Sequence, residues 1–141
     1  MKKIISKHFP FAGYKAMTIW PFIFIREGMA WAYNERSDRH EHIHGEQQKE
    51  LLVAGMAISC ILWLVGCGWW SLIVLPIRFY LWYGIEYLIR WAYYKNRDTA
   101  YRNIAFEREA YAKEDDVVYL DSRKPFAWVK YIKNPTLLRD K

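Results

Sequence analysis

Three of the four histidines in this chain fall within five consecutive residues, His40-Glu41-His42-Ile43-His44. The outer two satisfy the pattern HExxH. On an α-helix, residues four positions apart lie one above the other on one face. The imidazoles of His40 and His44 are therefore placed to bind one zinc ion, with Glu41 beside them to take a proton from an activated water. His42 points elsewhere and need not be a ligand.

A catalytic zinc ion also needs a third protein ligand and an open position for water. The segment FEREAYAK, residues 106–113, offers two carboxylates, Glu107 and Glu109. Glu109 has Lys113 four residues further on, which is the spacing of an exposed ion pair. Glu107 shares a face with apolar residues, and an inward carboxylate needs a partner such as a metal cation. The pattern favours Glu107 as the third ligand and leaves Glu109 as the alternative.

The histidine motif requires a helix to position it, and the sequence predicts one over residues 36–65, polar at first and apolar from Leu51. An apolar, aromatic helix is expected over 70–95 and a helix carrying the glutamates over 98–113, followed by a basic tail, 114–141, with a short helical stretch near its middle. Gly66 and Gly68 should end the first helix. The expected N-caps are Ser37 or Asp38 for the first helix and Asp98 or Thr99 for the third.

Residues 1–35 are predicted to form an irregular lead-in and a β-hairpin. The segment MTIWPFIFIR, residues 17–26, is rich in β-branched and aromatic residues, and MAWAY, residues 29–33, follows a Glu-Gly turn as the returning strand. Pro21 has no N–H for a ladder, so the first strand should lie at an edge. The expected fold is one domain, mainly α with a small β-hairpin, in which a zincin-like active-site helix continues into an apolar helical hairpin.

Composition excludes several classes of protein. The chain has 141 residues, enough for one domain; 53% of them are hydrophobic and 18% aromatic, so it is not a disordered protein. The net charge is +6, but acidic residues are interleaved with basic ones almost everywhere, which argues against a nucleic-acid partner. Two cysteines, Cys60 and Cys67, do not make a disulfide scaffold and are expected to be reduced, buried and inert.

The middle of the chain indicates a lipid bilayer as partner. Residues 51–77 form an uncharged run longer than the roughly 20 apolar residues that span a bilayer core as a helix. Tryptophans and tyrosines lie in or beside this run, as interfacial anchors do, and both ends of the chain are basic. These features predict a protein of a bacterial inner membrane with its site facing the cytoplasm, in which helix 70–95 lies along the interface.

With HEHIH and, downstream, Glu107-Arg108-Glu109-Ala110, the chain resembles the gluzincin class of zinc metallopeptidases, whose pattern is HExxH followed by E-x-x-A-D on a second helix. It is also similar to small bacterial membrane proteins that carry this motif. The resemblance implies Zn²⁺ as cofactor, Glu107 as third ligand, Glu41 as catalytic base and a peptide or protein substrate. Tyr111 stands where the class usually has an aspartate that orients a ligand histidine.

The same resemblance implies that a peptide substrate pairs with an edge strand above the catalytic helix. The strand with PFIFIR is the expected partner, with Phe22, Ile23 and Phe24 as substrate-binding residues. Tyr101 and Tyr111 are candidates for an oxyanion stabiliser or for a group that supports the ligands. The expected function is hydrolysis of peptide bonds; the alternative is a non-enzymatic integral membrane protein with a structural or vestigial metal site.

Overall fold

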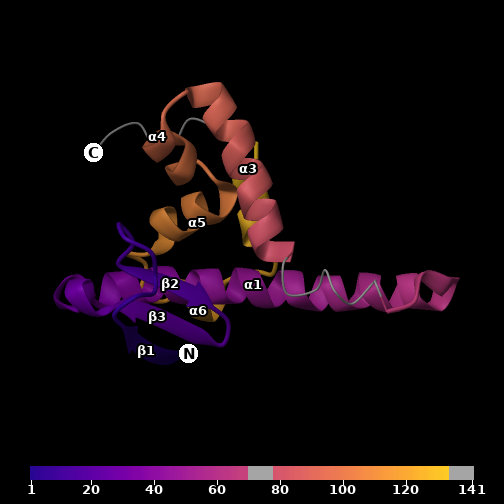
Figure 1. Ribbon diagram of the computed structural model, residues 1–141, viewed down its shortest axis with the longest axis horizontal. Coiled ribbons are helices and arrows are strands. Elements are labelled where there is room, and N and C mark those ends of the chain that lie inside the picture. The colour runs from indigo at the N-terminus through magenta and orange to yellow at the C-terminus, as the bar shows by residue number, and fades with distance from the viewer. Residues whose placement is uncertain (70–77, 134–141) are drawn as a thin grey trace.

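The amino-terminal residues form a three-stranded sheet in the computed structural model, which describes residues 1–69 and 78–133 (Figure 1). Its strands are β1 (Lys2–Ser6), β2 (Ala16–Ile19) and β3 (Phe22–Arg26). The strand order is β1-β3-β2, with β1 parallel and β2 antiparallel to β3. The strand that carries FIFIR is therefore the central one.

Three details of the predicted hairpin are wrong. The segment 17–26 is not one strand, because Pro21 stands in the tight connection between β2 and β3. Residues 29–33 do not return as a strand; η1 (Glu27–Ala32) is a 3₁₀-helix. Residues 2–6, expected to be irregular, form β1 and cover the second edge of β3. The parallel partner of β3 comes from about 20 residues away, so no local pattern signals it.

The HEHIH motif lies on a long helix, α1 (Glu35–Leu62), as predicted. The N-cap is Asn34, whose side chain accepts a hydrogen bond from the Ser37 N–H, and not Ser37 or Asp38. The helix continues through one π-helical turn, η2 (Trp63–Cys67). Gly66 then adopts a φ of 92°, a left-handed conformation that glycine enters without steric cost, so the predicted end is confirmed.

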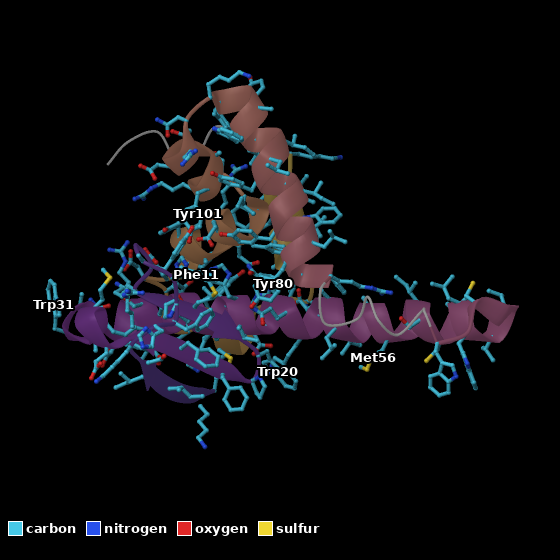
Figure 2. All side chains as sticks on the ribbon, viewed as in Figure 1. Phe11, Trp20, Trp31, Met56, Tyr80 and Tyr101 are labelled. Carbon is cyan, nitrogen blue, oxygen red and sulfur yellow. The ribbon has the colours of Figure 1, made fainter. Side chains whose placement is uncertain are left out.

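The second half of α1 projects beyond the rest of the protein (Figure 1). The helical segment Glu35–Cys67 is long and apolar enough to cross a membrane, and only 11% of its most apolar window is buried within the protein. Met56 lies on this projecting half (Figure 2). Cys60 and Cys67 are exposed there, so the prediction that they are buried is wrong. The beginning of the predicted helix 70–95 lies outside the described residues.

The remaining helices stand on the first half of α1 (Figure 1). They are α3 (Arg78–Tyr94), α4 (Arg97–Arg102), α5 (Ala105–Lys113) and α6 (Tyr119–Ser122), followed by a 3₁₀-helix, η3 (Ala127–Tyr131). The predicted helix 98–113 is thus two helices, broken after residue 102. The N-cap of α4 is Asn96 rather than Asp98 or Thr99.

The core lies on both sides of α5. One cluster joins α3, α5 and η3, and a second joins α1, α5 and α6. Six successive residues of α5, from 105 to 110, are buried, so this short helix is enclosed all round. Enclosure on every side means that the acidic residues of α5 must find partners inside the protein. The fold therefore fixes α5 against the motif-bearing turn of α1.

Candidate metal centre

Three potential ligands from two helices converge between α1 and α5. The Nε2 atoms of His40 and His44 are 3.1 Å apart. The carboxylate of Glu107 approaches both, with Oε2 at 3.4 Å from His40 Nε2 and Oε1 at 3.3 Å from His44 Nε2. The three ligand atoms lie within 4.8 Å of one another. The structure thus brings together the three residues that the sequence favours as zinc ligands.

Hydrogen bonds to Gln47 determine which nitrogen of His44 carries the proton. The Gln47 Nε2 group donates to the Phe106 carbonyl at 3.1 Å and to Glu109 Oε2 at 3.0 Å, so its amide orientation is set by two acceptors. Its Oε1 atom therefore faces His44 Nδ1, 2.8 Å away, and must accept a proton from it. The neutral imidazole of His44 then presents a lone pair at Nε2.

Glu114 does the same for the other ligand histidine. Its Oε2 atom lies 2.8 Å from His40 Nδ1, and its Oε1 atom accepts from Arg36. Burial alone would raise the pKa of Glu114, but the hydrogen bond to His40 and the charge of Arg36 hold it below its usual value. A carboxylate accepts the Nδ1 proton, so His40 also presents a lone pair at Nε2.

Two lone pairs and a carboxylate that face one point repel each other unless a cation lies between them. Glu107 is 2% exposed, and its Oε2 atom has no hydrogen-bond donor, while Oε1 accepts from the Tyr83 hydroxyl at 2.8 Å. Burial would raise the pKa of Glu107, but the two histidines lower it well below its usual range. Two imidazoles and one carboxylate form a donor set typical of catalytic zinc, so these residues fit the metal.

Glu41 lies beside this cluster and is held by the sheet. Its Oε2 atom accepts a hydrogen bond from the Thr18 hydroxyl of β2 at 2.8 Å, and the same hydroxyl lies 3.0 Å from the Glu41 carbonyl. Thr18 is buried, as is Glu41. The sheet therefore fixes the position of the carboxylate that the motif assigns to proton transfer.

A cleft leads from the surface to the ligands. Its inner part, about 130 Å³, is lined by all three ligands and by Glu41, and its outer part, about 600 Å³, is lined by His40 and Glu41. Tyr101 lines both parts, and Tyr111 lines the outer one, with its ring 4.8 Å from that of His40 between centroids. Figure 2 shows Tyr101 on the side of α1 from which α3 rises. Substrate-sized molecules therefore have access to this site.

The predicted substrate-binding residues do not line this cleft. Phe22, Ile23 and Phe24 belong to the central strand, whose two edges are already paired, so the prediction of an edge strand there is wrong. Ile23 is completely buried. The strand beside the ligands is β2, which contributes Ala16, Met17 and Thr18 to the wall of the inner cleft.

Glu109 does not join the ligands, and its expected exposed pairing with Lys113 is wrong. It is completely buried, and its carboxylate accepts from Arg123 Nε at 2.6 Å and from the Tyr119 hydroxyl at 2.7 Å. Arg123 also contacts the carboxylate of Glu50 on α1. This network holds Glu109 where it orients Gln47, one step away from His44.

Several supporting residues are not apparent from the motif. They are Thr18, Gln47, Tyr83, Glu114 and Arg123. Gln47 carries one usable signal, since a polar side chain three residues after His44 lies on the same helix face. Glu114 supplies the carboxylate that Tyr111 does not, from a position three residues further on.

No family model matches this chain, and neither a curated protein nor a solved structure matches it.

Proposed function

We propose that this protein is a membrane-associated, zinc-dependent metallopeptidase. The observation that carries the proposal is the convergence of two imidazole lone pairs and a buried, partly unpaired carboxylate, next to Glu41 and open to a cleft. A purely structural metal site is closed by four protein ligands, whereas three ligands beside a cleft leave a position for water and substrate. The gluzincin resemblance of the motif points to the same chemistry.

In this proposal His40, His44 and Glu107 hold the ion, and each is in turn held by a group that orients it. When bound, zinc supplies Lewis acidity, which acidifies water and polarises a peptide carbonyl. Glu41 acts as general base towards a water in the inner cleft and then returns the proton to the leaving amine. Thr18 holds its Oε2 atom, so we assign the proton to Oε1.

The outer edge of β2 is the proposed docking strand for an extended peptide. The Thr18 carbonyl points away from β3, since it accepts from Gln48 and Tyr80. Main-chain groups alternate along a strand, so those of Ala16 face the same way, towards the cleft that this residue lines. A peptide strand added at Ala16 would pass the ligands, which moves the proposed contact from residues 22–24 to β2.

The apolar half of α1 places this chemistry beside lipid. Leu51 begins the apolar run seven residues after His44, an axial rise of about 10 Å. Membrane-proximal segments of peptides or proteins are therefore the proposed substrates. The basic ends of the chain favour a cytoplasm-facing site in a bacterial inner membrane. Protease added to sealed vesicles of known orientation tests this: cleavage of the tail only from the external face would overturn it.

The function is tested with detergent-purified protein. We expect close to one zinc ion per chain by elemental analysis, and its loss in His40→Ala and Glu107→Ala. Glu41→Gln should keep the metal and abolish hydrolysis of a peptide library followed by mass spectrometry. Glu46→Gln is the matched control, because Glu46 lies on the same helix and pairs only with Lys49 in the described chain.

Two results would contradict the proposal. Absence of bound zinc removes the catalytic centre altogether. Bound zinc with the same background of hydrolysis in wild type and Glu41→Gln would favour the alternative, a non-enzymatic membrane protein with a structural metal site.

A further inference from the structure

The outer cleft carries positive charge that the protein itself does not neutralise. Its wall includes Lys15, Arg97 and Arg102. None of these three forms an ion pair within residues 1–69 and 78–133. Lys15 donates to the Ser37 hydroxyl at 2.6 Å, which leaves its charge uncompensated. The two arginines lie over aromatic rings, Arg97 over Trp91 and Arg102 over Tyr111.

Most acids of the same wall are already engaged. Glu114 contacts Arg36 and His40, and Glu41 accepts from Thr18. Asp98 is the remaining carboxylate on the wall, against three cations. A cleft with this excess attracts an anionic group, and its partly enclosed walls strengthen the attraction.

Tyrosine hydroxyls add neutral donors to these cations. Tyr14, Tyr87, Tyr101 and Tyr111 line the outer cleft. Burial and the charge of Glu107 raise the pKa of Tyr101 far above its usual value and that of Tyr111 to about 12. Both phenols therefore keep their protons at neutral pH and can donate to a carboxylate.

We propose that this wall, which includes Lys15, Arg97 and Arg102, selects peptides that carry an aspartate or glutamate about three residues from the bond to be cut. The inference rests on the proposed function. The ring centroids of His40 and Tyr111 are 4.8 Å apart, and the Arg102 guanidinium carbon lies 5.4 Å from the Tyr111 centroid. Arg102 is therefore within about 10 Å of His40, and an extended chain advances about 3.3 Å per residue.

The position of the wall favours a peptide over a lipid headgroup. The part of α1 that lines the outer cleft is its first turns, Ser37, His40 and Glu41. Leu51 begins the apolar run about 15 Å further along the helix axis. The wall thus lies on the side of the ligands away from the apolar half of α1, where an acidic residue outside the membrane would bind.

The test is direct binding of fluorescent peptides to the Glu41→Gln protein, which does not need turnover. Three peptides differ only at the third residue from the scissile bond, which is Glu, Gln or Lys. We expect the Glu peptide to bind about fivefold more tightly than the Gln peptide at low salt, as for a partly exposed charge pair, and the difference to shrink at high salt. The Lys peptide should bind most weakly.

Variants of Arg102 assign the preference to the wall. Arg102→Gln should bring the Glu-to-Gln ratio close to one, whereas Arg102→Lys keeps the charge and should retain most of it. Lys124→Gln removes an exposed charge outside the cleft lining and should leave the ratio unchanged. Retention with lysine at position 102 separates a charge effect from a folding defect.

Three outcomes would overturn the inference. Equal dissociation constants for the three peptides would do so, as would an acidic preference that survives Arg102→Gln. The third is an effect of Arg102→Gln on binding to phosphatidylglycerol vesicles alone, which would make the wall a lipid-binding surface. Failure of the function itself is read separately, from hydrolysis by wild type compared with Glu41→Gln.

Discussion

Gln47 is the residue whose replacement tests the metal centre most sharply without touching a ligand. It is completely buried and connects His44 with the Phe106 carbonyl and with Glu109. Gln47→Met keeps the approximate length of the side chain and removes all three hydrogen bonds. The His44 Nδ1–H and the Phe106 carbonyl then lose a partner inside the protein.

Each buried polar group left without a partner costs about 1–3 kcal/mol. Glu109 keeps its bonds to Arg123 and Tyr119, so two groups bear the loss. We expect the free energy of unfolding of the metal-free protein to fall by about 2–4 kcal/mol. Without its acceptor, His44 is also free to move its proton to Nε2, which blocks the metal-binding lone pair, and zinc affinity should fall by about 10- to 100-fold.

Zinc affinity is measured by competition with a chromophoric chelator, and stability by urea unfolding in detergent with a metal chelator present. Glu46→Gln, on the exposed side of the neighbouring turn, serves as control for both. If Gln47→Met lowers stability but binds zinc as tightly as wild type, the tautomer argument is refuted and Gln47 has only a packing role.

Glu114→Gln keeps an acceptor for His40 Nδ1 but removes the charge, so zinc affinity should fall by about tenfold in the same chelator competition. Thr18→Val releases the Glu41 carboxylate; kcat for peptide hydrolysis should fall by about tenfold while zinc content by elemental analysis stays constant. Arg123→Met leaves two buried carboxylates without their cation, and the free energy of unfolding by urea should fall by about 3–5 kcal/mol. Unchanged values in any of these assays would contradict the contact concerned.

Local periodicity was sufficient to predict the motif-bearing helix. The i, i+4 spacing of His40 and His44, the polar start, the apolar run and the terminal glycine all act within a few residues, and α1 follows them. The inward orientation of Glu107 was also predictable, because it shares a helix face with Ile104, which is completely buried. The ion pair between Glu86 and Arg90 follows the same helical spacing.

Contacts between distant segments were not predictable. The β1 strand pairs in parallel with β3, which converts the expected edge strand into the central one and moves the free edge to β2. Glu109 looked exposed because Lys113 stands one turn away, but the chain after α5 brings Arg123 back to cover it. Each error has the same physical origin: propensity and helical spacing describe neighbours in sequence, whereas burial depends on what packs from elsewhere.

The sequence alone thus determined that two imidazoles and a carboxylate base share one helix face, and that an apolar segment follows them along the same helix, since both properties depend only on helical geometry. The tertiary structure alone decided what makes these residues a metal centre. It brings Glu107 to the Nε2 atoms, sets both histidine tautomers through Gln47 and Glu114, and places Thr18 on Glu41. These groups come from separate elements, and only the packing of α5 and the sheet against α1 brings them within hydrogen-bonding distance.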